Sequence, residues 1–242
     1  TVVAWNWKAN GSGSANGEGS ITTTATSANT DAGFSIVSWT GNDTNGATLG
    51  HGLDSTPQLI ITKRRDGDAI SWYTYNETIG NTKYLKLEDT VAETTSAIWN
   101  DTSPTATLFS VSDGAGINSS SNAYIAYCFH SVDGYSKVGS YVGNGDDDGT
   151  FVYLGFRQAF TMIKRTDSTD DWFIQDNKRN TYNVVGTFLY PNLNNAEYTE
   201  NNMDFLSNGM KFRLNNANWN DDGDTYIYLA FAETPFKYSN AR

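Results

Sequence analysis

Short apolar and aromatic stretches separated by turn residues recur along the chain, and this alternation predicts strands rather than helices. Asp66-Gly67 and Asn208-Gly209 are strong hairpin signals. The best helix candidate covers residues 89–99. The predicted strands lie at 34–39, 59–62, 69–75, 151–156, 160–164, 172–175 and 226–232, with a hairpin across 205–214. The fold class that follows is all-β.

The N-terminal region precedes the first of these strands. Residues 1–9 alternate in β fashion, with Trp5 and Trp7 on one face. Residues 10–20 are rich in Gly, Ser and Asn, which predicts a flexible loop. The Thr-, Ser- and Ala-rich stretch 21–30 is a candidate polar edge strand.

The chain also repeats itself at an interval of about a hundred residues. SWTGN at 38–42 is matched by SYVGN at 140–144, PQLIITKR at 57–64 by QAFTMIKR at 158–165, and AYIAYCF at 123–129 by TYIYLAF at 225–231. Units of this length are domains rather than short repeats. We therefore predict two tandem duplicated β-sandwich-like units, 34–138 and 139–242, after an N-terminal strand and linker at 1–33. Trp72 and Trp172 hold the same place in both.

Composition narrows the classes of partner. The net charge of -11 and the pI near 4.5 argue against a nucleic-acid surface and against an anionic membrane. No apolar run approaches a membrane span, so we expect no membrane insertion. The single cysteine, Cys128, cannot form an internal disulfide and is expected to be a buried apolar residue. The start lacks an initiator Met, and we expect the chain to begin inside a longer polypeptide or after processing.

Catalytic and metal-binding signals are weak. His51 and His130 have no histidine counterparts in the other unit, and a zinc site needs three or four clustered ligands. There is no Gly-x-Ser-x-Gly motif. Lys63-Arg64 and Lys164-Arg165 each follow a predicted buried strand, so we expect them to mark its solvent end. We predict that the protein is not an enzyme and needs no cofactor.

Acidic loops keep calcium open as an alternative. Turn formation by Asp and Gly explains the loops, but calcium prefers the same oxygen-rich setting. The candidate calcium ligands are Asp146, Asp147, Asp148, Asp221, Asp222 and Asp224.

Aromatic side chains suggest one further type of site. Trp99 and Trp219 lie beside Asn and Asp in predicted loops, which makes them the candidate residues for exposure and for stacking on a glycan receptor. The alternative is that both rings simply pack against the neighbouring unit.

Several segments together resemble a domain of uncharacterised function found in virion proteins of marine tailed phages, cyanophages among them. They are WNWK at 5–8, FSIVSWTGN at 34–42, GHGL at 50–53, AYCFHSVDGYSKVGSY at 126–141, DFLSNG at 204–209 and YIYLAFAETPF at 226–236. Gln158 stands where proline is expected. In such proteins the domain often follows a concanavalin-like laminin-G domain, and the resemblance supplies no catalytic residues.

The resemblance implies a virion structural protein, a tail-fibre or appendage segment for host attachment. Its partners would be other virion proteins, further copies of itself in a homo-oligomer (a trimer if it is a fibre), and host surface polysaccharide. The alternatives are a capsid-decorating or head-fibre protein, a carbohydrate-binding module, and last a glycan depolymerase.

The acidic loops generate a first test. Because turn formation explains them, removing metal with EDTA should change the melting temperature little. A drop of more than about 10 °C, beyond what a kcal/mol shifts a domain of this size, would show that calcium holds these loops.

Overall fold

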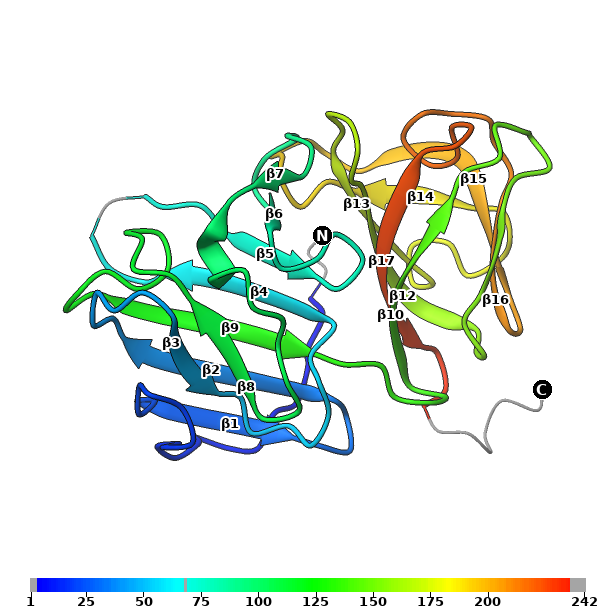
Figure 1. The fold of residues 1–242 in the computed structure, drawn as a ribbon. Helices are drawn as coiled ribbons and strands as arrows, with labels where there is room; N and C mark the ends of the chain where they lie inside the picture. The colour runs from blue at the N-terminus through cyan, green and yellow to red at the C-terminus, as the bar shows by residue number, and fades with distance from the viewer. Residues whose placement is uncertain (1–3, 68, 236–242) are drawn as a thin grey trace. The chain divides into compact units, whose positions relative to one another are not determined.

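The computed structural model describes residues 4–67 and 69–235. Asp68, in the first predicted hairpin, lies outside them. The described residues divide into two compact units: residues 4–67, 69–75, 80–83 and 96–130 form the first, and residues 76–79, 84–95 and 131–235 form the second. The architecture is all-β, as the residue pattern predicts (Figure 1).

The first sheet has seven strands in the order β1-β2-β9-β4-β5-β6-β7. β2 lies between β1 and β9, and both pairings are antiparallel. The strand bounds are β1 Ala25–Asn29, β2 Phe34–Thr40, β4 Leu59–Arg64, β5 Tyr73–Asn76, β6 Lys83–Lys86, β7 Thr94–Thr95 and β9 Ala123–Phe129.

A two-stranded sheet packs against the first sheet in the first unit. β3 (Ala47–Gly50) and β8 (Leu108–Val111) pair antiparallel. The buried rings of Trp39 on β2 and Phe109 on β8 meet edge to face with centroids 6.0 Å apart. Apolar side chains from both sheets thus form one sandwich-like core, since each strand turns alternate side chains toward the other sheet.

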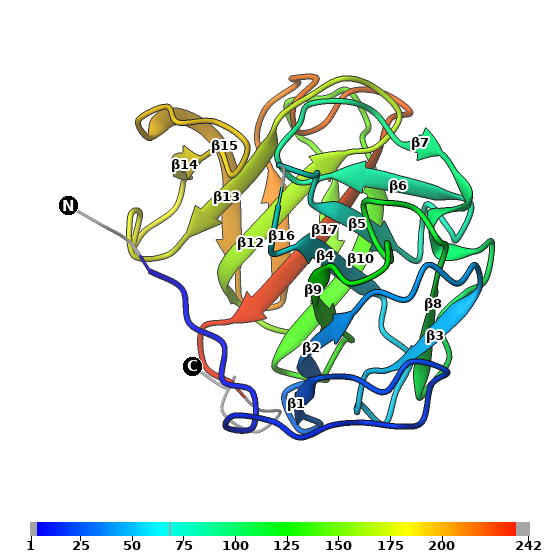
Figure 2. The ribbon, with the colours of Figure 1, turned by 90° about the vertical axis from the view of Figure 1, so that its left-hand side faces the viewer.

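The third sheet has eight strands in the order β10-β17-β12-β13-β14-β15-β16-β11 and is nearly closed and barrel-like (Figure 2). Its interior is filled by buried side chains such as Phe173, Phe188 and Trp219. β10 and β11, which follow one another in the chain, are the two ends of the strand order. The bounds are β10 Ser136–Val142, β11 Phe151–Tyr153, β12 Gln158–Arg165, β13 Trp172–Asp176, β14 Val185–Leu189, β15 Tyr198–Leu206, β16 Gly209–Phe212 and β17 Thr225–Ala232.

Most predicted strands are present, with some shifts. The candidate edge strand in 21–30 is β1, and the predicted hairpin across 205–214 is β15–β16. Residues 4–9 alternate in exposure, with Trp5 and Trp7 half-buried, but form no strand. The predicted strands 69–75 and 151–156 are shorter than expected.

The helix predicted over residues 89–99 is wrong. Only a 3-10 turn at Ala97–Trp99 is helical there, and β7 occupies part of the rest. Packing overrides the weak helical pattern, because Ile98 and Trp99 at this turn are both buried. No helix in the described part of the chain is long and apolar enough to cross a membrane.

A buried asparagine ties two loops together in the first unit. The Asn118 side chain donates to Asn42 Oδ1 and to the Thr44 carbonyl, both at 3.0 Å, and accepts from the Asn42 N–H at 3.2 Å. The Tyr124 hydroxyl accepts from the Ser119 N–H and donates to the Ala115 carbonyl, both at 2.9 Å. These bonds fix the chain just after β2 against the loop that precedes β9.

The second unit holds a network of the same composition. The Asn220 side chain donates to Asn144 Oδ1 at 2.8 Å and to the Asp146 carbonyl at 2.9 Å, and accepts from the Asn144 N–H at 3.2 Å. The Tyr226 hydroxyl accepts from the Asp221 N–H and donates to the Ala217 carbonyl. This network fixes the chain after β10 against the loop before β17.

These networks generate a stability test. Asn118→Ala should lower the free energy of unfolding by about 2–4 kcal/mol, because it leaves several buried polar groups without partners. Asn195→Ala, at an exposed position, is the matched control and should stay near the wild type. Urea denaturation measures both, and an Asn118→Ala protein as stable as the control would contradict the structural role of the network.

Candidate binding site

The seam between β10 and β11 is the candidate site. The backbones of these two strands are not paired with each other in the sheet. Side chains bridge them instead: Thr150 Oγ1 donates to the Val142 carbonyl at 2.9 Å, and Lys137 Nζ donates to the Tyr153 carbonyl at 2.8 Å. Adjacent paired strands bond through their backbones at a spacing of about 4.8 Å, whereas here side-chain atoms make the contacts.

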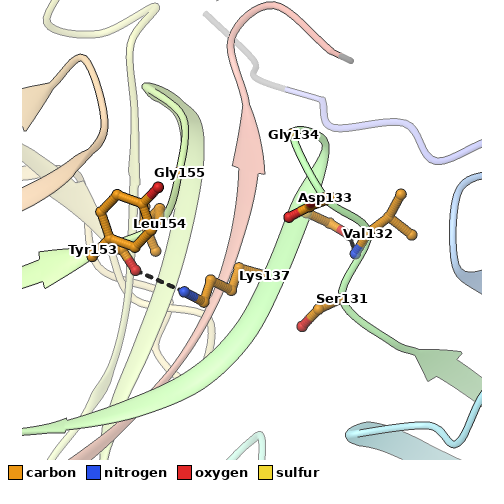
Figure 3. Close-up of a pocket in the computed structure, with 9 residues that line it drawn as sticks. Ser131, Val132, Asp133, Gly134, Lys137, Tyr153, Leu154 and Gly155 are labelled. Carbon is orange, nitrogen blue, oxygen red and sulfur yellow. Dashed lines mark hydrogen bonds between the residues drawn. The ribbon is translucent and has the colours of Figure 1, made fainter. Parts of the chain in front are cut away.

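A cavity of about 120 Å³ lies in this seam. One wall is the loop before β10, with Ser131, Asp133 and Gly134, and the opposite wall is Tyr153–Gly155. Figure 3 shows Lys137 reaching from β10 toward the backbone of Tyr153, while Ser131–Gly134 lie on the other side of the cavity. The ammonium group also lies over the Tyr153 ring, 5.3 Å from its centroid.

Exposed apolar side chains flank the same seam. Tyr153 is 60% exposed, Phe151 44% and Val142 55%. The seam therefore combines an apolar surface, two charged groups and hydroxyls, which suits it to contact with a partner molecule. The sequence analysis did not single out these residues. One signal was available: the run Phe-Val-Tyr at 151–153 is apolar on both faces of a short strand, although a surface edge strand usually has one polar face.

The tryptophans predicted for glycan stacking do not face solvent, and the exposure predicted for them is wrong. Trp99 is 2% exposed, donates from Nε1 to the Lys83 carbonyl at 3.0 Å and meets Tyr75 edge to face. Trp219 is 0% exposed and packs against Phe173 and Phe188. Burial of a large aromatic surface outweighs the polar neighbours in sequence that suggested exposure.

Trp72 and Trp172 pack differently from each other. Trp172 is buried and donates from Nε1 to the Lys86 carbonyl at 2.8 Å. Trp72 is half-buried and stacks on Tyr127, with Lys63 Nζ 5.6 Å from its ring centroid.

The first acidic loop is held by contacts within the protein. Asp148 pairs with Lys211 at 2.8 Å, and this hydrogen bond holds the pKa of the carboxyl below its usual range. Asp147 accepts from the Asn215 N–H, and Asp146 accepts from the Asp148 N–H.

The second acidic loop is held by Arg165, which pairs with Asp224 at 2.5 Å and lies 3.8 Å from Asp221. Asp222 donates its N–H to Asp221. Within residues 4–67 and 69–235, no group of three His, Cys, Asp or Glu side chains is placed to hold a metal ion. Calcium binding at either loop stays a prediction.

Lys164 is buried and not at the solvent end of its strand, which corrects the prediction for this residue. Its ammonium donates to the carbonyls of Arg165 at 2.7 Å and Thr90 at 3.3 Å. Burial lowers its pKa to about 8. Both hydrogen bonds go to the main chain, which gives Lys164 a structural use.

Cys128 is buried as predicted, and burial raises the pKa of its thiol to about 12. His51 is also buried. Its Nδ1 accepts from the Leu53 N–H at 3.1 Å, so Nε2 carries the proton and donates to the Thr105 carbonyl at 3.2 Å. Neutral imidazole satisfies both bonds, and burial lowers the His51 pKa from 6.5.

The chain belongs to a family described as a domain of unknown function, DUF7483, whose model matches residues 1–235. No curated protein and no solved structure matches the chain.

The neutral state of His51 generates a pH test. A folded-state pKa below 6.5 means that the unfolded chain takes up the proton first, so stability present above pH 6.5 is lost as the pH falls below it. Between pH 7.5 and 5.5, the wild type should lose unfolding free energy through His51, by at most about 1.4 kcal/mol per pH unit for one proton.

Urea denaturation at the two pH values checks this, with His51→Asn as the test variant and His130→Asn as the control. The loss should shrink in the first variant and persist in the second. Equal losses in all three proteins would show that His51 does not carry the effect.

Proposed function

We propose that this chain is a non-enzymatic structural segment of a phage virion, part of a tail fibre or similar appendage that serves host attachment. The observation that carries the structural part is the use of the same buried Asn and Tyr network in each unit. The virion part is supported by the sequence resemblance described above. A capsid-decorating or head-fibre protein is the alternative within the same class.

The proposal includes an internal duplication, which the equivalent hydrogen bonds support. Asn42 and Asn118 are 76 residues apart, and so are Asn144 and Asn220. Aromatic stacking follows the same pattern: Trp39 stacks on Tyr124 at 5.3 Å, and Tyr141 stacks on Tyr226 at 4.9 Å.

Two glycines give further support. A Cβ on Gly41 would lie 2.2 Å from the Ser119 carbonyl oxygen, and one on Gly143 would lie 2.1 Å from that of Asp221. Each close approach excludes any side chain, so both units need glycine at this point.

The order of strands is also consistent with duplication. If each strand from β2 to β9 is matched in chain order to a strand from β10 to β17, the strand orders in the sheets agree. The order β2-β9-β4-β5-β6-β7 corresponds to β10-β17-β12-β13-β14-β15, and the pair β3–β8 corresponds to the pair β11–β16. A duplicated all-β scaffold is a building block that presents loops and edges, which fits attachment or assembly.

The carbohydrate-binding alternative required exposed rings at Trp99 and Trp219, and both side chains are buried. Tyr153 is an exposed ring beside a polar cavity, but the Lys137 ammonium already lies over it. A glycan array with the purified protein tests this alternative, and sugar release from host polysaccharide tests the depolymerase.

The virion proposal predicts that the protein is part of purified particles. Mass spectrometry of particles from a phage that encodes this chain should detect it, and antibody labelling in electron micrographs should place it on the tail. Absence from washed particles would overturn the proposal, and label on the head would favour the capsid-decorating alternative.

If the protein is a fibre segment, light scattering of the full-length polypeptide should give the mass of a trimer. The mass of a monomer would count against the fibre proposal.

A further inference from the structure

In the first unit, the N-terminal segment occupies the edge that β2 would otherwise leave open. β1 pairs antiparallel with β2, and Ala25 is opposite Ser38. The Thr24 N–H donates to the Ser38 carbonyl at 2.7 Å. The same segment reaches β3, because Ile21 forms a parallel bridge with Leu49 and donates its N–H to the Thr48 carbonyl at 3.0 Å.

Residues 25–29 therefore run antiparallel to β2, and Ile21 just before them forms one parallel bridge to β3. On the side away from β2, Thr26 exchanges both of its backbone hydrogen bonds with Ser14. The side chains of this segment are well covered: Ile21, Thr23, Thr26 and Ser27 are buried. The segment closes this edge by backbone hydrogen bonds, which is how sheets avoid open edges.

The corresponding edge in the second unit is that of β10. Backbone groups of alternate residues of β10 point away from β17, since antiparallel strands bond through every second residue. Near the start of β10 these outward groups are used: Ser136 bonds with Val132, and the Val138 N–H donates to Ser131 Oγ at 3.0 Å. At Ser140, which stands where Ser38 stands in the first unit, the outward N–H and C=O bond to no described residue.

The segment just before β10 is too short to supply a covering strand. β9 ends at Phe129 and β10 begins at Ser136, whereas in the first unit the residues that make the backbone bonds at this edge extend from 14 to 29, ahead of β2 at Phe34. The seam flanked by Val142, Phe151 and Tyr153 thus lacks the strand that its counterpart has.

We propose that the seam between β10 and β11 binds an extended segment of another polypeptide, antiparallel to β10 and parallel to β11. The inference rests on the duplication in the proposed function. The occupant is a Thr-, Ser- and Ala-rich strand with a β-branched apolar residue at its start, because this is the chemistry of residues 21–29 that fills the equivalent space. On binding, an incoming N–H replaces Lys137 at the Tyr153 carbonyl, and the apolar part of the segment covers Phe151 and Tyr153. This is β-strand addition, in which main-chain bonds supply affinity and alternate side chains supply specificity.

A synthetic peptide of residues 19–29 of this chain is the probe. Labelled with a fluorophore and titrated with the intact protein, it should give a saturable rise in anisotropy. A peptide with Thr24→Pro should bind at least about tenfold more weakly, because it lacks the N–H that donates to the Ser38 carbonyl in the first unit. No binding of the unmodified peptide up to its solubility limit would overturn the proposal.

Two protein variants locate the site. Ser140→Pro removes the outward N–H without touching the bonds to β17 and should weaken binding about tenfold or more. Ser140→Ala keeps the N–H and should bind like the wild type. Circular dichroism checks that both variants are folded. If Ser140→Pro does not fold, the comparison of the Thr24→Pro peptide with the unmodified peptide still decides the question. Equal binding by folded Ser140→Pro, or equal binding of both peptides, would overturn strand addition. Peptide binding does not depend on detecting the protein in virions, so its failure and that of the proposed function are distinguishable.

Discussion

A buried asparagine amide that bonds two loops is the interaction on which each unit depends. An amide removed from water costs free energy unless its donors and acceptors find partners. Asn118 and Asn220 find theirs in backbone groups and in a second asparagine. In each unit these bonds hold the loop after β2 or β10 against the loop that precedes β9 or β17.

Closing the sheet edges is the second constraint, and the two units meet it differently. The first unit uses its N-terminal segment, with β1 on β2 and Ile21 on β3. In the second unit, Ser131 and Val132 cover the start of the β10 edge, and the side chains of Thr150 and Lys137 bridge β10 to β11. Apolar residues of β11 stay exposed beside these bridges. An exposed edge with apolar flanks is a place for another strand, which is why the seam rather than a tryptophan loop is the candidate site.

The strands were largely predictable from sequence because apolar runs and Asp-Gly or Asn-Gly turns act locally. For example, the apolar runs predicted at 59–62 and 226–232 are present as the strands β4 and β17. The helix at 89–99 failed because burial of Trp99 overrides a weak local pattern. The prediction of exposed side chains failed for a related reason. Whether Trp99, Trp219 and Lys164 are exposed depends on which segments distant in sequence cover them, and the local sequence does not encode this. The open edge of β10 is equally invisible, since it depends on a strand that is present in one unit and lacking in the other.

The central claim is that matching Asn networks hold both units, and amide hydrogen exchange tests it most directly. Residue-level exchange of the native protein should show strong protection of the Asn42 and Ser119 N–H groups and equal protection of the Asn144 and Asp221 N–H groups, because each donates to a network atom. Exchange at either pair as fast as in the exposed loop around Asn195 would contradict the account.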